Sequence, residues 1–230
     1  MSSASQVLDS DSGKLFHIIF AKLLFISRRA KPDIQVPIGF LGTRVRCSTQ
    51  EVWIKLKSVL EYLKNTIEMP LTLGMKDTSL VSWWVDTSYG VHLDMESQTG
   101  GVMSFGKAAA YSCSRKQKLN TISLTEAELV GTADILPMII WTMIFLDAHR
   151  LYVKQSKLHQ DNKNTIQLII NGRLSSSKRT RHIRIHFYLI KYRVDKGEIE
   201  VVFCPTKRWV FLIYRPCLHQ KRVLECVPNT

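Results

Sequence analysis

Three acidic residues, Asp86, Glu128 and Asp161, lie at places from which their carboxylates could converge on one point. Asp86 lies within SWWVDTSY, an aromatic and β-branched stretch that is typical of a strand. Glu128 lies near the start of a long apolar segment with helical spacing, and Asp161 follows a short strand-like segment. Carboxylates on strand ends and on a packed helix can converge to hold Mg²⁺ or Mn²⁺, two of which can clamp a scissile phosphate. Taken singly, each acid is more simply a surface or capping residue.

The strands and helices predicted from residue 82 to residue 203 follow the order β-β-β-α-β-α-α-β, which predicts a mixed α/β fold with helices covering a sheet. The pattern of apolar residues places strands at 82–89, 102–107, 109–114, 157–160 and 199–203, and helices at 124–150, after 162, and at 182–194. We expect Gly100 and Gly101 to form a turn, Asn162 to cap a helix and Gly197 to end one. Pro137 should kink the long helix or divide it in two.

A separate helical segment is predicted upstream. Residues 1–13 are small and polar and should be frayed, whereas 14–66 contain two amphipathic stretches. In the second stretch, the expected buried stripe consists of Trp53, Leu56, Leu60 and Leu63. Residues 67–80 hold Pro70, Gly74 and a polar cluster, which indicates a linker before a domain at 81–206.

Composition restricts the partner and the compartment. With 32 Lys and Arg against 19 Asp and Glu, the net charge of +13 favours a polyanion, either nucleic acid or an acidic membrane surface. The five cysteines form no CxxC pair and are odd in number, which favours reduced thiols in the cytoplasm or nucleus. We expect no signal peptide, because residues 1–13 contain two aspartates and no basic residue. We expect no transmembrane helix, because the apolar run at 15–26 is shorter than the ~20 residues that a bilayer requires.

Four motifs, in the order in which they occur along the chain, resemble those of copia-type retrotransposon Pol polyproteins. WWVDTSYGVHLDMESQTGGVMSFG is similar to the opening hairpin of the family's ribonuclease H domain, and TISLTEAELVG to its SSTEAE helix start. QDNKNTIQLIIN and RHIRIHFYLIKYRVDKGEIEVVFCPT resemble two later blocks of that domain. Upstream, AKLLFISRRAKPDIQVPIGFLGTRV and WIKLKSVLEYLKNT look like the end of the reverse-transcriptase domain.

This resemblance implies a ribonuclease H-like domain with a mixed five-stranded sheet flanked by helices. It also implies hydrolysis of the RNA strand of an RNA–DNA hybrid with two Mg²⁺ or Mn²⁺ ions and no small-molecule cofactor. Asp86, Glu128 and Asp161 match the family's catalytic acids, Glu128 being preferred to Glu126 because the second glutamate of TEAE is the usual ligand.

The sequence departs from the family at two places. After Thr206 the family continues into a helix that opens with the fourth catalytic aspartate, but residues 207–230 contain no aspartate and form a divergent tail. Arg184 stands where the family usually has an acid. The polymerase aspartates of the family are not in the chain, so we expect no DNA synthesis and an impaired nuclease.

Basic residues near these motifs are candidates for phosphate contacts. The nucleic-acid-binding candidates are Arg115, Lys116, Lys118, Lys178, Arg179, Arg181 and Arg184. A solvated basic loop is the simpler alternative. Two other functions also stay open, namely a catalytically inactive domain that still binds nucleic acid and an interaction protein, adopted by a host or a pathogen, that keeps only the fold.

Overall fold

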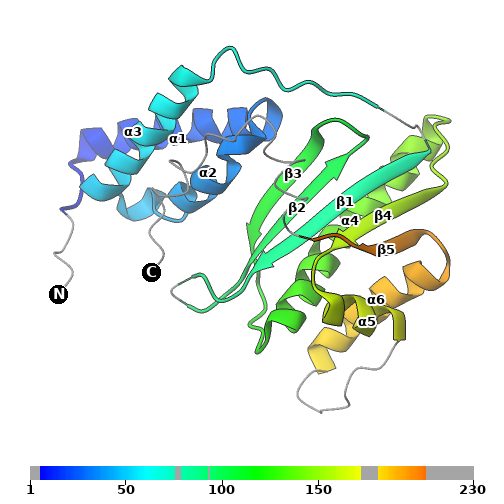
Figure 1. Ribbon diagram of the computed structural model, residues 1–230. Coiled ribbons are helices and arrows are strands. Elements are labelled where there is room, and N and C mark those ends of the chain that lie inside the picture. Colours follow the sequence, from blue (N-terminus) through cyan, green and yellow to red (C-terminus); the bar gives the residue numbers. More distant parts are fainter. Residues whose placement is uncertain (1–5, 76–78, 93, 172–180, 206–230) are drawn as a thin grey trace. The chain divides into compact units, whose positions relative to one another are not determined.

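The computed structural model describes residues 6–75, 79–92, 94–171 and 181–205, and the side chains of 181–186 are outside the description. The described chain forms two compact units, one up to Leu71 and one from Thr72 onward. Each unit has its own hydrophobic core, and Figure 1 shows helices in the first and a sheet with helices in the second. The division falls inside the segment 67–80.

The first unit consists of helices α1 (Ser10–Arg29), α2 (Gln35–Gly42) and α3 (Gln50–Asn65), joined by two short 3₁₀ helices, η1 (Pro32–Ile34) and η2 (Val45–Cys47). Its core comprises Phe16, Leu23, Ile34, Ile38, Leu41, Val52, Leu56 and Val59. The buried carboxylate of Asp33 accepts a 2.7 Å hydrogen bond from the Tyr62 hydroxyl and so attaches η1 to α3.

Two expectations for this unit are corrected in part. Residues 10–13 are not frayed, because the Asp9 side chain accepts hydrogen bonds from the backbone N–H groups of Asp11 and Ser12 and caps α1. In α3 the expected Leu56 is buried, and Trp53 and Leu63 pack against the core. Leu60 is exposed instead, and Val52 and Val59 are buried.

The second unit is built on a five-stranded sheet with the spatial order β3-β2-β1-β4-β5. The strands are β1 (Leu80–Ser88), β2 (Gln98–Ser104), β3 (Ala109–Lys116), β4 (Gln155–Gln160) and β5 (Ile199–Phe203). The pairs β1–β2 and β2–β3 are antiparallel, whereas β1–β4 and β4–β5 are parallel. The predicted mixed five-stranded sheet is therefore confirmed, with β1 at its centre.

Three helices complete this unit: α4 (Leu124–Ala148), α5 (Lys163–Asn171) and α6 (Arg181–Asp195). Apolar side chains from all three share one core with the sheet, where α4 packs against β1 and against α6. The predicted cap is confirmed, since the Asn162 side chain accepts hydrogen bonds from the N–H groups of Asn164 and Thr165. Gly197, at φ +71°, follows α6 in the left-handed conformation expected of a helix end.

Two expectations about glycine and proline are corrected here. Gly100 and Gly101 lie within β2 and form no turn. A Cβ at Gly101 would lie 2.6 Å from the Ile135 side chain, so glycine is needed where α4 crosses the sheet. Pro137 lies inside the continuous helix α4, and the alternative of two helices is wrong.

Helix α4 is apolar because it is a core helix. Among the described residues it alone is long and apolar enough to cross a membrane, and 56% of that span is buried inside the protein. Its buried side chains include Leu129, Ile135 and Leu136, which pack in the core shared with the sheet.

We predict that Gly131→Ala destabilises the second unit. The new Cβ would overlap Thr87 Oγ1 and lie 3.2 Å from Thr99 Oγ1, and both threonines are buried on paired strands. Overpacking of this kind costs about 1–3 kcal/mol, to be measured by urea unfolding. Gly13→Ala in α1 is the control, because its Cβ would be 3.9 Å from the nearest atom and should stabilise the helix. Equal or greater stability of Gly131→Ala would contradict the prediction.

Candidate functional site

The register of the two central parallel strands brings Asp86 and Asp161 together. Trp84 on β1 is paired with His159 on β4, and their rings are stacked with centroids 4.7 Å apart. Asp86 lies two residues beyond Trp84, and Asp161 lies two residues beyond His159. Parallel strands in register therefore place the two carboxyl groups at the same level of the sheet.

Glu128 reaches the same place from α4. The helix begins after Ser123, whose hydroxyl accepts a hydrogen bond from the Glu126 N–H at 3.2 Å. Gly131, one turn after Glu128, has no side chain to separate α4 from Thr87 and Thr99. The close packing at Gly131 brings Glu128 to the sheet, where its side chain is only 2% exposed.

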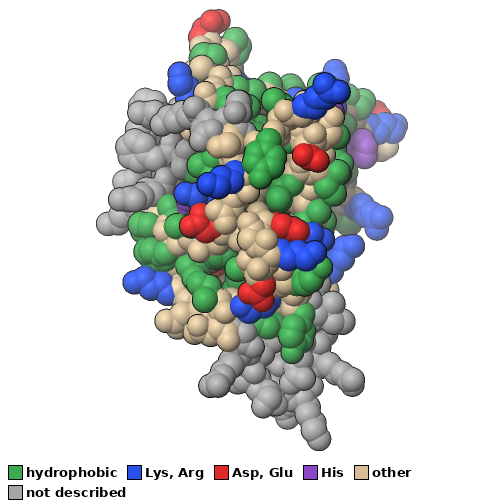
Figure 2. All heavy atoms as spheres, turned by 90° about the vertical axis from the view of Figure 1, so that its right-hand side faces the viewer, with side chains coloured by type: hydrophobic (Ala, Val, Ile, Leu, Met, Phe, Trp, Pro, Cys, Tyr) green, Lys and Arg blue, Asp and Glu red, His purple; other side chains and the backbone are tan. Residues whose placement is uncertain are grey.

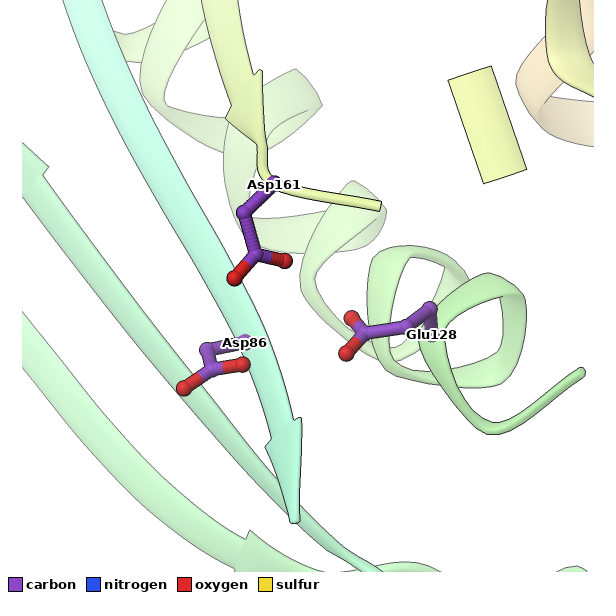
Figure 3. Close-up of side chains that lie close together, drawn as sticks. All are labelled: Asp86, Glu128 and Asp161. Carbon is purple, nitrogen blue, oxygen red and sulfur yellow. The ribbon is translucent and has the colours of Figure 1, made fainter. Parts of the chain in front are cut away.

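The three carboxylates converge, as the close-up in Figure 3 shows. One oxygen from each of Asp86, Glu128 and Asp161 lies within 4.8 Å of the other two. Glu128 is buried, whereas Asp86 and Asp161 are only partly covered. The cluster thus has a buried end at the helix and a side that is open to solvent.

Burial and mutual repulsion alter the proton affinity of the cluster. Burial first, and the Asp86 carboxylate second, raise the pKa of Glu128 to about 8. Burial and the nearby Asp161 also raise the pKa of Asp86. Neither Asp86 nor Glu128 forms an ion pair with a basic side chain in the described part of the chain. Asp86 and Glu128 therefore lie close together without a described basic side chain paired to either of them.

This donor set fits a hard divalent cation. Mg²⁺ and Mn²⁺ prefer carboxylate oxygens, and three such oxygens within 4.8 Å of one another can share a cation. A bound cation also reverses the effect of repulsion on the pKa, because it favours the ionised carboxylates. The acidic cluster is therefore a candidate metal centre.

Gln160 contacts two parts of this site and was not among the predicted residues. It is fully buried at the end of β4, and its side-chain amide donates a 3.2 Å hydrogen bond to Glu128 Oε2. Its amide oxygen accepts hydrogen bonds from the N–H groups of Asp161 and Asn162. The available sequence signal was weak, because Gln160 ends a strand of mixed polarity directly before an acid.

Glu126 has a different task from Glu128. Its carboxylate accepts a 3.0 Å hydrogen bond from the Ile122 N–H and helps to cap the start of α4. The structure places Glu128, two residues further on, beside Asp86 and Asp161.

The predicted phosphate-binding residues do not form one described strip. Arg115, at the exposed end of β3, donates a hydrogen bond to the Tyr111 hydroxyl at 3.1 Å. Lys116 pairs with Asp94 and also with Glu96, at 2.9 Å, so acids already offset its charge. On the face in Figure 2, basic side chains are interspersed with acidic and hydrophobic ones.

The other predicted phosphate-binding residues are Lys118, Lys178, Arg179, Arg181 and Arg184. Lys118 is exposed shortly after β3. Lys178 and Arg179 lie outside the described residues, and Arg181 and Arg184 belong to α6 with side chains that are not described. Binding of nucleic acid by these residues stays a prediction.

Comparison with known sequences finds similarity to proteins of plant transposons. The chain is 26% identical over 185 residues to the retrovirus-related Pol polyprotein from transposon TNT 1-94 of Nicotiana tabacum, a match that covers 80% of the chain. The chain is therefore similar in sequence to a transposon Pol polyprotein. A second such protein, from transposon RE2 of Arabidopsis thaliana, is 26% identical over 76% of the chain. The chain spans only 14% and 12% of these two relatives. No protein-family model matches it.

Solved structures similar to this chain include ribonuclease H and reverse transcriptase. RNase H1 from Halobacterium salinarum NRC-1 is 11% identical, covers 56% of this chain and 88% of its own, and has a TM-score of 0.40. The foamy viral protease-reverse transcriptase, solved with an RNA/DNA hybrid, is 12% identical, covers 86% of this chain and 27% of its own, and has a TM-score of 0.47. The sheet and helix order described above is the one expected for a ribonuclease H-like fold.

We predict that the raised pKa of Glu128 makes the metal-free protein less stable as pH rises. The folded state holds the proton up to about pH 8, whereas the unfolded state releases it near 4.5. Between these values the folded state binds more protons, so stability falls by up to about 1.4 kcal/mol per pH unit from this group. In EDTA, Glu128→Gln should remove this slope in urea unfolding between pH 5 and pH 8.

The comparison with added Mg²⁺ provides the control. Because a cation favours the ionised carboxylates, Mg²⁺ should stabilise the parent at pH 8 more than it stabilises Glu128→Gln. Parallel pH profiles for parent and variant in EDTA would show that the buried carboxyl has an ordinary pKa.

Proposed function

We propose that the chain carries a ribonuclease H-type domain that hydrolyses the RNA strand of RNA–DNA hybrids with Mg²⁺ or Mn²⁺. The observation that supports this most is the convergence of Asp86, Glu128 and Asp161 within 4.8 Å, on elements in ribonuclease H-like order. The relationship to transposon Pol polyproteins and the net charge of +13 agree with a nucleic-acid substrate.

Asp86, Glu128 and Asp161 hold the divalent cations in this proposal. Such cations supply the positive charge that lets a phosphodiester approach three carboxylates and the Lewis acid that its hydrolysis needs. Asp86 contributes from the central strand, where its backbone is paired with Gly100 of β2, and Trp84, two residues earlier, is paired with His159 of β4. The main chain that carries its carboxylate is therefore held within the sheet. Asp161 and Asp86 form the accessible side, and buried Glu128 closes the site from α4. Hydrolysis leaves a 3′-hydroxyl and a 5′-phosphate.

The proposed activity is impaired relative to a site with four acids. Residues 206–230 lie outside the described structure, and their sequence contains no aspartate to act as a fourth ligand. With one ligand fewer, less of the cationic charge is held in place at the transition state. Each factor of ten in rate corresponds to about 1.4 kcal/mol of lost stabilisation. The same observation favours a second function, in which the domain binds hybrid without cleaving it.

We expect Asp86→Asn to abolish cleavage of a labelled RNA–DNA hybrid in Mg²⁺ or Mn²⁺, because the amide offers a weaker ligand and removes one negative charge. Gel analysis of the cleaved strand gives the rate, which should fall by at least about 100-fold. Asp147→Asn is the matched control, since Asp147 is an exposed acid in the last turn of α4. Equal cleavage by Asp86→Asn and the parent would exclude this site, whereas binding without any cleavage would leave the second function.

We expect Arg115 and Lys116 to contribute unequally to the affinity for an RNA–DNA hybrid. Arg115→Ala should weaken binding uniformly across sequences and reduce the slope of log affinity against log salt by about one, as expected for one lost phosphate contact. Lys116→Ala should have a smaller effect, because Asp94 and Glu96 already pair with its ammonium group. Fluorescence anisotropy at several salt concentrations measures both slopes. A larger effect for Lys116→Ala would show that the ion pairs open on binding.

A further inference from the structure

Gln160 lies between two of the three carboxylates of the proposed metal centre. It is the last residue of β4, and its side chain is fully buried. Its backbone carbonyl accepts a 3.0 Å hydrogen bond from the Cys204 N–H, just after β5, so its main chain is fixed within the sheet. The side chain thus extends from a rigid point toward Glu128 and Asp161.

The orientation of its amide is determined by its partners. The amide oxygen accepts hydrogen bonds from the N–H groups of Asp161, at 2.8 Å, and Asn162, at 3.3 Å. Only an oxygen can accept both, so the NH₂ group must point the other way. There it donates to Glu128 Oε2 at 3.2 Å. The two ends of the amide therefore have separate and fixed partners.

Each end constrains one carboxylate. The NH₂ group uses one lone pair of Glu128 Oε2 and limits rotation of that carboxyl group. The amide oxygen holds the backbone at Asp161 and Asn162, and the Asn162 side chain in turn caps α5. Because Glu128 and Asp161 repel each other, a group that holds both counteracts their separation.

We propose that Gln160 is a positioning residue that sets the separation of Glu128 and the Asp161 turn, so that both carboxylates meet one divalent cation together with Asp86. This inference rests on the proposed metal-dependent function. Gln160 does not itself bind the cation, since its oxygen and its NH₂ group are both engaged with protein. Its role is that of an outer partner that orients the ligands.

The test is a titration of the full 230-residue chain with Mn²⁺ alone, in which electron paramagnetic resonance measures the concentration of the free ion. Gln160→Met has a similar volume and removes both hydrogen-bonded ends of the amide. We expect it to weaken Mn²⁺ binding about 10- to 100-fold, which is usual for loss of an outer partner. With hybrid as substrate at fixed Mn²⁺, kcat should fall while KM stays unchanged, because buried Gln160 does not reach the duplex.

Gln155→Met is the matched control, because it makes the same substitution at the other end of β4. Gln155 donates a long 3.4 Å hydrogen bond to the Gly197 carbonyl and contacts none of the three acids. Its Mn²⁺ affinity should equal that of the parent. A similar loss in both variants would mean that a weakened strand, and not Gln160, causes the effect, and would overturn the inference.

A second variant covers the case in which Gln160→Met does not fold, as judged by circular dichroism. Gln160→Asn keeps a buried amide but is one methylene shorter, so it cannot hold Glu128 and the Asp161 turn at once. It should lower Mn²⁺ affinity by about tenfold. Binding within threefold of the parent would overturn the inference and leave the proposed function intact. Absence of Mn²⁺ binding by the parent would instead overturn the proposed function, and the inference with it.

Discussion

Repulsion among three carboxylates is the constraint around which the second unit is arranged. Burial first, and the neighbouring carboxylates second, raise the pKa of Asp86 and of Glu128, so the fold holds these groups together at a cost. The central position of β1, the close approach of α4 at Gly131 and the end of β4 each fix one member. Burial of Glu128 adds to the cost, which a bound cation would offset.

Much of the fold follows from periodicity in the sequence. The order of strands and helices in the second unit was predicted correctly because alternating and helical patterns are clear in its apolar segments. The failures have local physical causes. Gly100 and Gly101 are typical of a turn, but here both lie in β2, and Gly101 allows the Ile135 side chain of α4 to approach the sheet, a contact that depends on residues far away in the sequence. Leu60 and Val59 are both apolar, and only tertiary packing decides which of them is buried.

The three acids of the candidate site could be proposed from the sequence, but Gln160, which contacts two of them, could not. Asp86, Glu128 and Asp161 were found because a carboxylate in an apolar segment is unusual and because their order matches a known family. Gln160 carries no charge and belongs to a short segment of mixed polarity, so its role depends on which residues face it across the fold. The pairing of Lys116 with Asp94 and Glu96 was equally hidden, because it joins β3 to the loop before β2.

The stacked rings of Trp84 and His159 have a consequence for the register of the two central parallel strands. Burial lowers the pKa of His159, which favours the neutral imidazole, and this ring stacks on the indole with centroids 4.7 Å apart. If β1 and β4 were offset by a single residue, this overlap would be lost and the side chains of one strand would turn to the opposite face of the sheet. The ring pair therefore favours the register in which Asp86 and Asp161 lie at the same level of the sheet.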